Sequence, residues 1–129
     1  EGYTEMTDSK LAKHNILIVE GEDFTKTFEL EKEDESLVDL TGFSAVGEVR
    51  DKFSSDGKLL MNFNFVVNDN RLTAFIDRED TYDLTDRTNS TDYPVKIGYY
   101  DIFLIRPSGE YSYLLGGIVM YAQTITHGE

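Results

Sequence analysis

The sequence predicts an all-β antiparallel sandwich of roughly seven or eight short strands. Short runs of alternating apolar and polar residues recur along the chain, and turn residues separate them at intervals of about 8–12 residues. No long run has the 3.6-residue apolar period of an amphipathic helix, and no internal repeat is evident. A closed β-barrel is the main structural alternative.

The strands expected before the last part of the chain are short. They are residues 15–22, 24–30, 44–52, 58–67 and 71–77. A short helical turn is expected near residues 78–86, packed beneath the edge of a sheet. Residues 1–14 lack strand periodicity, so we divide the chain into an N-terminal arm (1–14), a sandwich domain (15–126) and a tail (127–129).

The strongest strand pattern is a hairpin over residues 96–121, with its turn at Pro107 and Gly109. Tyr100, Ile102 and Leu104 alternate along one face and are expected to point into the core. The other face is also apolar and carries Tyr99, Phe103, Ile105, Leu114, Ile118 and Met120. A strand face exposed to water is normally polar, so we expect a partner chain to cover this second face.

The size, charge and cysteine content limit the class of protein. The 129 residues correspond to one domain, large enough to bury a hydrophobic core. The net charge of −13 opposes binding to nucleic-acid phosphates and is compatible with a basic partner or divalent cations. The absence of cysteine excludes disulfides and thiolate chemistry, and fits folding in a reducing cytoplasm. No apolar run reaches the ~20 residues of a membrane-spanning helix.

Three short motifs resemble a known family. In the first, residues 39–43, a short acceptor side chain and a glycine that permits positive φ set a bend into the next strand. The second combines residues 100–101 with the turn at 107–109, and the third is residues 114–119, where a glycine marks a bulge or a close backbone approach. The motif residues that we single out are Asp39, Leu40, Thr41, Gly42, Pro107, Gly109 and Gly117.

Over residues 14–126 the chain resembles small structural proteins of tailed-bacteriophage and prophage virions that have an immunoglobulin-like β-sandwich. It is similar in kind to the N-terminal domains of baseplate and tail-fibre attachment proteins. The resemblance implies a non-enzymatic capsid, neck, tail or baseplate component, made in the host bacterial cytoplasm. Its expected partners are other virion proteins or copies of itself, with no nucleic acid, membrane or cofactor.

No catalytic, cofactor-binding or metal site is expected. The two histidines, His14 and His127, lie at opposite ends of the chain, and nothing in the sequence places either beside a serine. The acidic segment 77–92 lacks the spacing, central glycine and final glutamate of an EF-hand, which favours a solvated loop.

Two other functions remain as alternatives. The first is a carbohydrate- or receptor-binding module of a phage tail, in which the hairpin tyrosines stack on sugar rings. The second is a calcium-stabilised, adhesion-like sandwich that uses the acidic segment 77–92.

Overall fold

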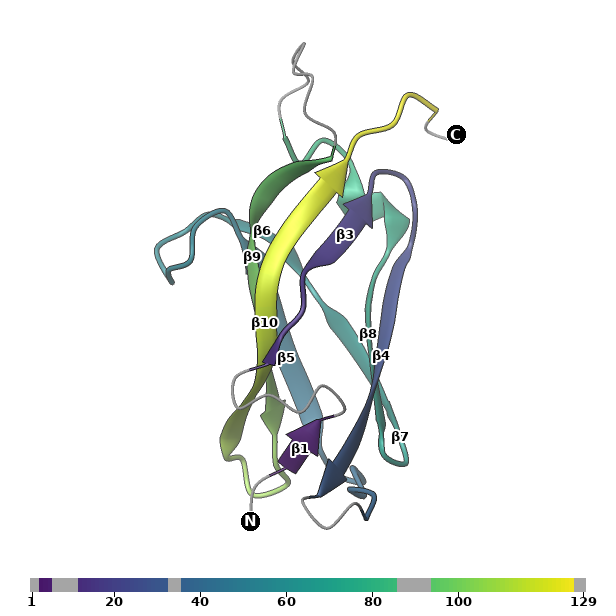
Figure 1. The fold of residues 1–129 in the computed structure, drawn as a ribbon, viewed down its shortest axis with the longest axis vertical. Coiled ribbons are helices and arrows are strands. Elements are labelled where there is room, and N and C mark those ends of the chain that lie inside the picture. The colour runs from purple at the N-terminus through teal and green to yellow at the C-terminus, as the bar shows by residue number, and fades with distance from the viewer. Residues whose placement is uncertain (1–2, 6–11, 33–35, 86–93, 127–129) are drawn as a thin grey trace.

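The computed structural model describes residues 3–5, 12–32, 36–85 and 94–126 of the chain. They form a four-stranded sheet, which we call sheet I, a six-stranded sheet, which we call sheet II, and one short 3-10 helix, η1 (Arg78–Thr81). The sheets face each other along the long axis of the molecule, with sheet II on the left and sheet I on the right in Figure 1. The prediction of an all-β sandwich is confirmed.

Sheet I has the strand order β1-β4-β8-β7, and all neighbours are antiparallel. Its strands are β1 (Tyr3–Glu5), β4 (Phe24–Lys32), β7 (Asn64–Asn68) and β8 (Arg71–Ile76). Sheet II has the order β2-β10-β9-β5-β6, and β3 also pairs with β10. Its strands are β2 (Ala12–Lys13), β3 (Ile16–Val19), β5 (Ser44–Arg50), β6 (Leu59–Asn62), β9 (Val95–Ile105) and β10 (Tyr111–Ala122).

This strand order is that of an immunoglobulin domain. In such domains one sheet has the order ABED, and the other places strand F between C and G. Here β1-β4-β8-β7 follows the ABED order, and β5-β9-β10 follows the CFG order. β6 extends sheet II beyond β5 at one edge. At the opposite edge, β2 and β3 each pair in parallel with β10. The fold is an immunoglobulin-like β-sandwich.

The chain changes sheets between β6 and β7, at Phe63. β6 pairs with β5 in sheet II, whereas β7 pairs with β8 in sheet I. At the crossing point the backbone N–H of Phe63 still donates to the carbonyl oxygen of Gly47 on β5, at 3.0 Å. The single strand predicted over residues 58–67 is therefore two strands that belong to different sheets.

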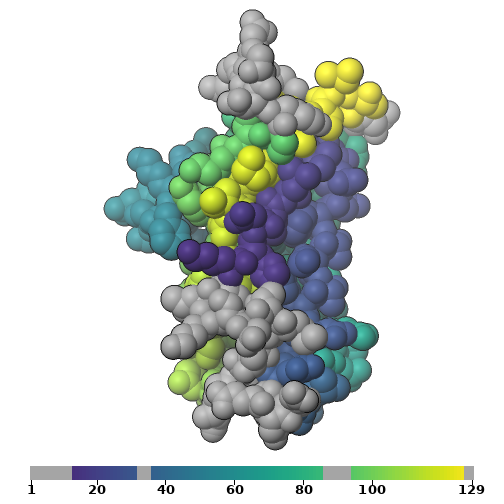
Figure 2. Space-filling model, viewed as in Figure 1, coloured from purple at the N-terminus to yellow at the C-terminus, as the bar shows by residue number. Residues whose placement is uncertain are grey.

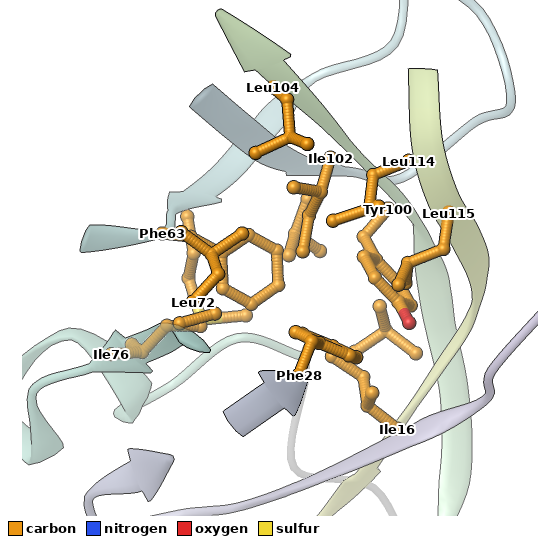
Figure 3. Packing of buried hydrophobic residues seen from close by; sticks show 14 of the residues in the cluster. Ile16, Phe28, Phe63, Leu72, Ile76, Tyr100, Ile102, Leu104, Leu114 and Leu115 are labelled. Carbon is orange, nitrogen blue, oxygen red and sulfur yellow. The ribbon is translucent and has the colours of Figure 1, made fainter. Parts of the chain in front are cut away.

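The core lies between the sheets and is filled from both of them (Figure 3). On β9, Tyr100, Ile102 and Leu104 point inward and are at most 3% exposed. Leu72 of β8 faces them from sheet I and is fully buried. The ring of Phe63 lies 5.5 Å from the ring of Tyr100, in an edge-to-face arrangement. The inward face that the sequence predicts for β9 is confirmed.

The predicted N-terminal arm contributes two short strands to the sandwich. β1 pairs with the end of β4, and β2 pairs with Leu115 and Gly116 of β10. Strands of three and two residues are too short to produce a recognisable alternation in the sequence. The predicted helical turn is the 3-10 helix η1, which ends at Thr81 rather than near residue 86. Residues 6–11 of the arm and the tail 127–129 lie outside the described residues.

Gly117 lies where the segment between β2 and β3 passes close to β10. A Cβ at this position would lie 2.1 Å from the carbonyl oxygen of His14. On either side, the N–H of His14 donates to the carbonyl oxygen of Gly116 at 3.0 Å, and the N–H of Ile118 donates to Asn15 Oδ1 at 3.1 Å. The close backbone approach that the sequence suggested for Gly117 is confirmed, because only glycine leaves room for it.

We expect Gly117→Ala to lower the free energy of unfolding by about 1–3 kcal/mol, because the added methyl group overpacks this contact. The displaced segment should also expose the β3 amides to faster hydrogen exchange. Urea unfolding and amide exchange measure both effects, with Ser112→Ala on the same strand as the control. An unchanged unfolding free energy for Gly117→Ala would contradict this interpretation.

Candidate protein-binding face

The outer face of sheet II carries partly exposed apolar side chains that the strand register aligns in rows. Val46 on β5 pairs with Phe103 on β9, which pairs with Tyr113 on β10. In the next row, Ile105 pairs with Tyr111. We call the whole set the apolar face: Val46, Tyr99, Phe103, Ile105, Tyr111, Tyr113, Ile118 and Met120.

The aromatic rings near the β9–β10 turn form a cluster within the apolar face. The ring of Phe103 lies 5.5 Å from that of Tyr113 and 6.3 Å from that of Tyr111, both edge-to-face. Tyr111 is 61% exposed and Tyr113 is 40% exposed. Edge-to-face pairs of this kind hold aromatic side chains in place. The cluster therefore presents a large apolar surface, and the motion of its rings is restricted.

A β-bulge determines which β10 residues belong to the apolar face. Tyr113 pairs with Phe103 and Leu115 pairs with Ile102, so Leu114 is an extra residue in the ladder. Leu114 is 8% exposed and belongs to the core cluster. The prediction that Leu114 lies on the outer face is therefore wrong. A strict two-residue alternation assigns every side chain beyond a bulge to the wrong face, and the bulge itself left no clear pattern in the sequence.

The row beside the aromatic cluster is charged. Glu48 on β5 pairs with Asp101 on β9, and Asp101 pairs with Gly116 on β10. The Arg50 guanidinium donates from Nε to Glu48 Oε1 at 2.9 Å and from Nη1 to the carbonyl oxygen of Gly57 at 2.7 Å. Partial burial raises the pKa of Asp101 above its ordinary value, the nearby Glu48 charge raises it further, and Arg50 partly offsets both.

A pocket of about 330 Å³ opens between this charged row and the loop that joins β5 to β6. That loop projects from the side of the molecule as a separate lobe, coloured blue-teal in Figure 2. Its Phe53 is 79% exposed, and its ring lies 5.7 Å from the ring of Tyr99. The pocket is lined by Glu48, Arg50, Lys52, Phe53, Ser54, Ser55, Tyr99, Tyr100 and Asp101.

The outer face of sheet I is more polar. Thr27 and Thr73 share a hydrogen bond of 2.9 Å between their hydroxyl groups across β4 and β8. In the same pair of strands Arg71 Nε donates to Glu29 Oε2 at 2.8 Å. Val66, which is 53% exposed, and the half-buried Phe75 are apolar exceptions. The two outer faces of the sandwich therefore differ in chemistry, and the apolar one belongs to sheet II.

The predicted motif residues of the two turns, 39–42 and 107–109, build one end of the sandwich. Asp39 Oδ1 accepts hydrogen bonds from the N–H and the hydroxyl of Thr41, and these bonds lower the pKa of Asp39. Gly42 and Gly109 both have positive φ, at 84° and 93°. A Cβ on Gly42 would lie 3.2 Å from Cγ of Pro107, so the two predicted turns touch. Leu40, which lies between Asp39 and Thr41 in the sequence, is fully buried. These positions shape the fold, as the sequence predicts.

The structure places most of the predicted interface residues together and adds others. Five of the six predicted side chains are partly exposed on the apolar face, and the sixth, Leu114, is in the core. Sequence reasoning missed Val46, although its alternation with Ala45 and Gly47 pointed to it. It also missed Phe53, because a side chain in a loop has no periodic pattern.

No metal-binding group of side chains is found in the described part of the chain. His14 lies beside β10 with its ring 6.2 Å from that of Phe28, and His127 is outside the described residues. No three His, Cys, Asp or Glu side chains in the described ranges could hold a metal ion together. Residues 86–92 of the acidic segment are not covered by that statement. No described helix has the length and apolar character needed to cross a membrane.

No family model matches the chain, and no curated protein matches it. Among solved structures, the titin M10–obscurin-like 1 Ig complex has a TM-score of 0.44 and 11% identity, covering 96% of this chain and 97% of that one. The twitchin kinase region of C. elegans has a TM-score of 0.38 and 13% identity, covering 88% of this chain and 16% of that one. At these similarities neither structure supports an argument about function.

The opposite pKa shifts of Asp101 and Asp39 predict opposite effects of removing each charge. The ionised Asp101 carboxylate is destabilising in the fold, and that penalty disappears as pH falls below its ordinary pKa of 3.8. We therefore expect Asp101→Asn to raise Tm at pH 7, with a gain that shrinks toward pH ~3.5.

The ionised Asp39 carboxylate is stabilising, because its hydrogen bonds from Thr41 lower its pKa. Asp39→Asn should therefore lower Tm at pH 7, with a loss that also shrinks in acid. Thermal unfolding across this pH range tests both signs, and a Tm for Asp101→Asn below that of the parent chain at pH 7 would contradict the account.

Proposed function

We propose that the chain is a non-enzymatic structural protein of a bacteriophage particle that acts by protein–protein assembly. In this proposal a neighbouring virion protein covers the apolar face of sheet II. The single observation that carries the proposal is the contrast between the two outer faces, apolar on sheet II and more polar on sheet I. The resemblance of the sequence to tailed-phage virion proteins supports the choice of particle.

The physical basis of assembly would be burial of the apolar face. Apolar area removed from water contributes about 25 cal/mol per Å², from which the costs of association are subtracted. A standard interface buries about 800 Å² on each side and derives most of its energy from a few central, often aromatic, side chains. The Phe103, Tyr111 and Tyr113 cluster provides such side chains. The net charge of −13 would oppose self-association before the partner is met.

A carbohydrate- or receptor-binding tail module is the second candidate. The observation in its favour is the exposure of two aromatic rings, Tyr111 at 61% and Phe53 at 79%, because exposed rings stack on sugars. Binding to a glycan array that is lost in Tyr111→Ala would support this function. The calcium-stabilised alternative has no support from the described residues, where no group of three potential metal ligands occurs.

The assembly proposal is tested by placing charges on the apolar face. The double variant Phe103→Asp, Ile118→Asp should reduce incorporation into particles by at least about tenfold, because burying two unpaired carboxylates costs more than 1.4 kcal/mol. The measurement is mass spectrometry of purified particles from a phage that lacks the gene and receives it from a plasmid.

The matched control adds the same charge to the opposite face. Thr25→Asp, Asn64→Asp changes two exposed residues on the outer face of sheet I and should leave incorporation within about twofold of the parent chain. Circular dichroism and Tm establish that both double variants fold. Normal incorporation of a folded Phe103→Asp, Ile118→Asp variant would overturn the proposal.

A further inference from the structure

The lining of the pocket beside the apolar face includes two acidic side chains, two cationic side chains and three aromatic rings, namely Glu48, Asp101, Arg50, Lys52, Phe53, Tyr99 and Tyr100. Three of them bear on ligand binding. Asp101, in the middle of β9, contributes a partly buried carboxylate. Phe53 and Tyr99 contribute rings whose planes are inclined at 51°, with their centroids 5.7 Å apart. The pocket has a volume of about 330 Å³ and is open to solvent. A carboxylate beside two rings is the combination that binds an organic cation, by charge and by cation–π contact.

Within the described residues, no donor hydrogen-bonds the Asp101 carboxylate, although its burial makes ionisation costly. The nearest cationic side chain, Arg50, directs its donors to Glu48 and to the carbonyl oxygen of Gly57. Lys52 borders the pocket but is exposed and forms no ion pair with Asp101. Glu48 thus forms an ion pair inside the chain, whereas Asp101 forms none with the described residues and its charge is only partly offset by Arg50.

Tyr99 already receives one cation from its own strand. Lys96 Nζ lies 5.0 Å from the centroid of the Tyr99 ring and donates to the Tyr99 hydroxyl at 2.9 Å. The Tyr99 ring therefore takes part in a cation–π contact within the chain. Phe53 has no such contact, and its exposure of 79% leaves its ring available to an incoming group.

We infer that this pocket receives an arginine side chain of the partner protein that covers the apolar face. The inference rests on the proposed function and adds the chemistry of the partner. Arginine fits better than lysine because its planar guanidinium can bind a carboxylate through two hydrogen bonds and stack on a ring at the same time. A net charge of −13 on this chain favours a basic partner over a second copy of itself.

The test uses single amino-acid derivatives as probes. N-acetyl-arginine amide is titrated into the ¹⁵N-labelled chain and followed by NMR, with N-acetyl-citrulline amide as the uncharged probe of the same shape and N-acetyl-lysine amide as the second cation. We expect saturable shifts at the amides of Asp101 and Phe53 with a Kd of about 1–10 mM, the range for one side chain. Citrulline should give at least about tenfold weaker binding.

Two variants and one control locate the binding. Asp101→Asn and Phe53→Ala should each weaken arginine binding, by about tenfold and about threefold. Asp80→Asn removes the same charge from an exposed position on η1 and should leave binding unchanged. Since Phe53 is exposed, its truncation does not threaten the fold.

The outcomes separate this inference from the proposed function. Equal shifts with citrulline, equal or tighter binding of lysine, or arginine binding unaffected by Asp101→Asn would each overturn the arginine pocket. If arginine fails to bind while charges on the apolar face still block incorporation, the inference fails and the assembly function stands. Concentration-dependent dimerisation that Asp101→Asn abolishes would also overturn it, because the pocket would then serve a second copy.

Discussion

The pairing of β9 with both β5 and β10 is the constraint on which the core and the candidate interface depend. Successive side chains of β9 point in opposite directions, so Tyr100 and Ile102 build the core while Tyr99 and Phe103 build the outer face. On β10 the bulge at Leu114 completes the arrangement. If β10 alternated strictly, with no bulge, Tyr113 and Ile118 would point to opposite sides of the sheet, and the apolar face would lose one of them.

Two properties of the chain act against each other at this surface. The apolar face favours association, whereas a net charge of −13 opposes the approach of a second copy. In the assembly that we propose, a basic partner would gain both from burial of the apolar face and from the opposite charge. Asp101, whose partly buried carboxylate is only partly offset by Arg50, lies beside the apolar face and combines both properties. The partner that we propose is therefore a protein other than a second copy of this chain.

Much of the fold could be predicted from the sequence, because most of it depends on local patterns. The alternation along β9 and the turn chemistry of Asp39 and Gly42 are local, and the structure confirms them. The bulge at Leu114 and the change of sheet at Phe63 depend on pairing with distant strands, so no local pattern reveals them. The pocket needs a loop residue, Phe53, to meet a strand residue far along the chain, which only the folded structure shows.

Hydroxyl-radical footprinting of the tyrosines tests the central claim, that the apolar face is covered in the particle. In the isolated chain Tyr111 and Tyr113 are 61% and 40% exposed, so both should be oxidised readily. In purified particles the account predicts oxidation of both that is several-fold slower, while Val66 on the outer face of sheet I keeps its rate. Equal tyrosine oxidation in the isolated chain and in particles would contradict the claim.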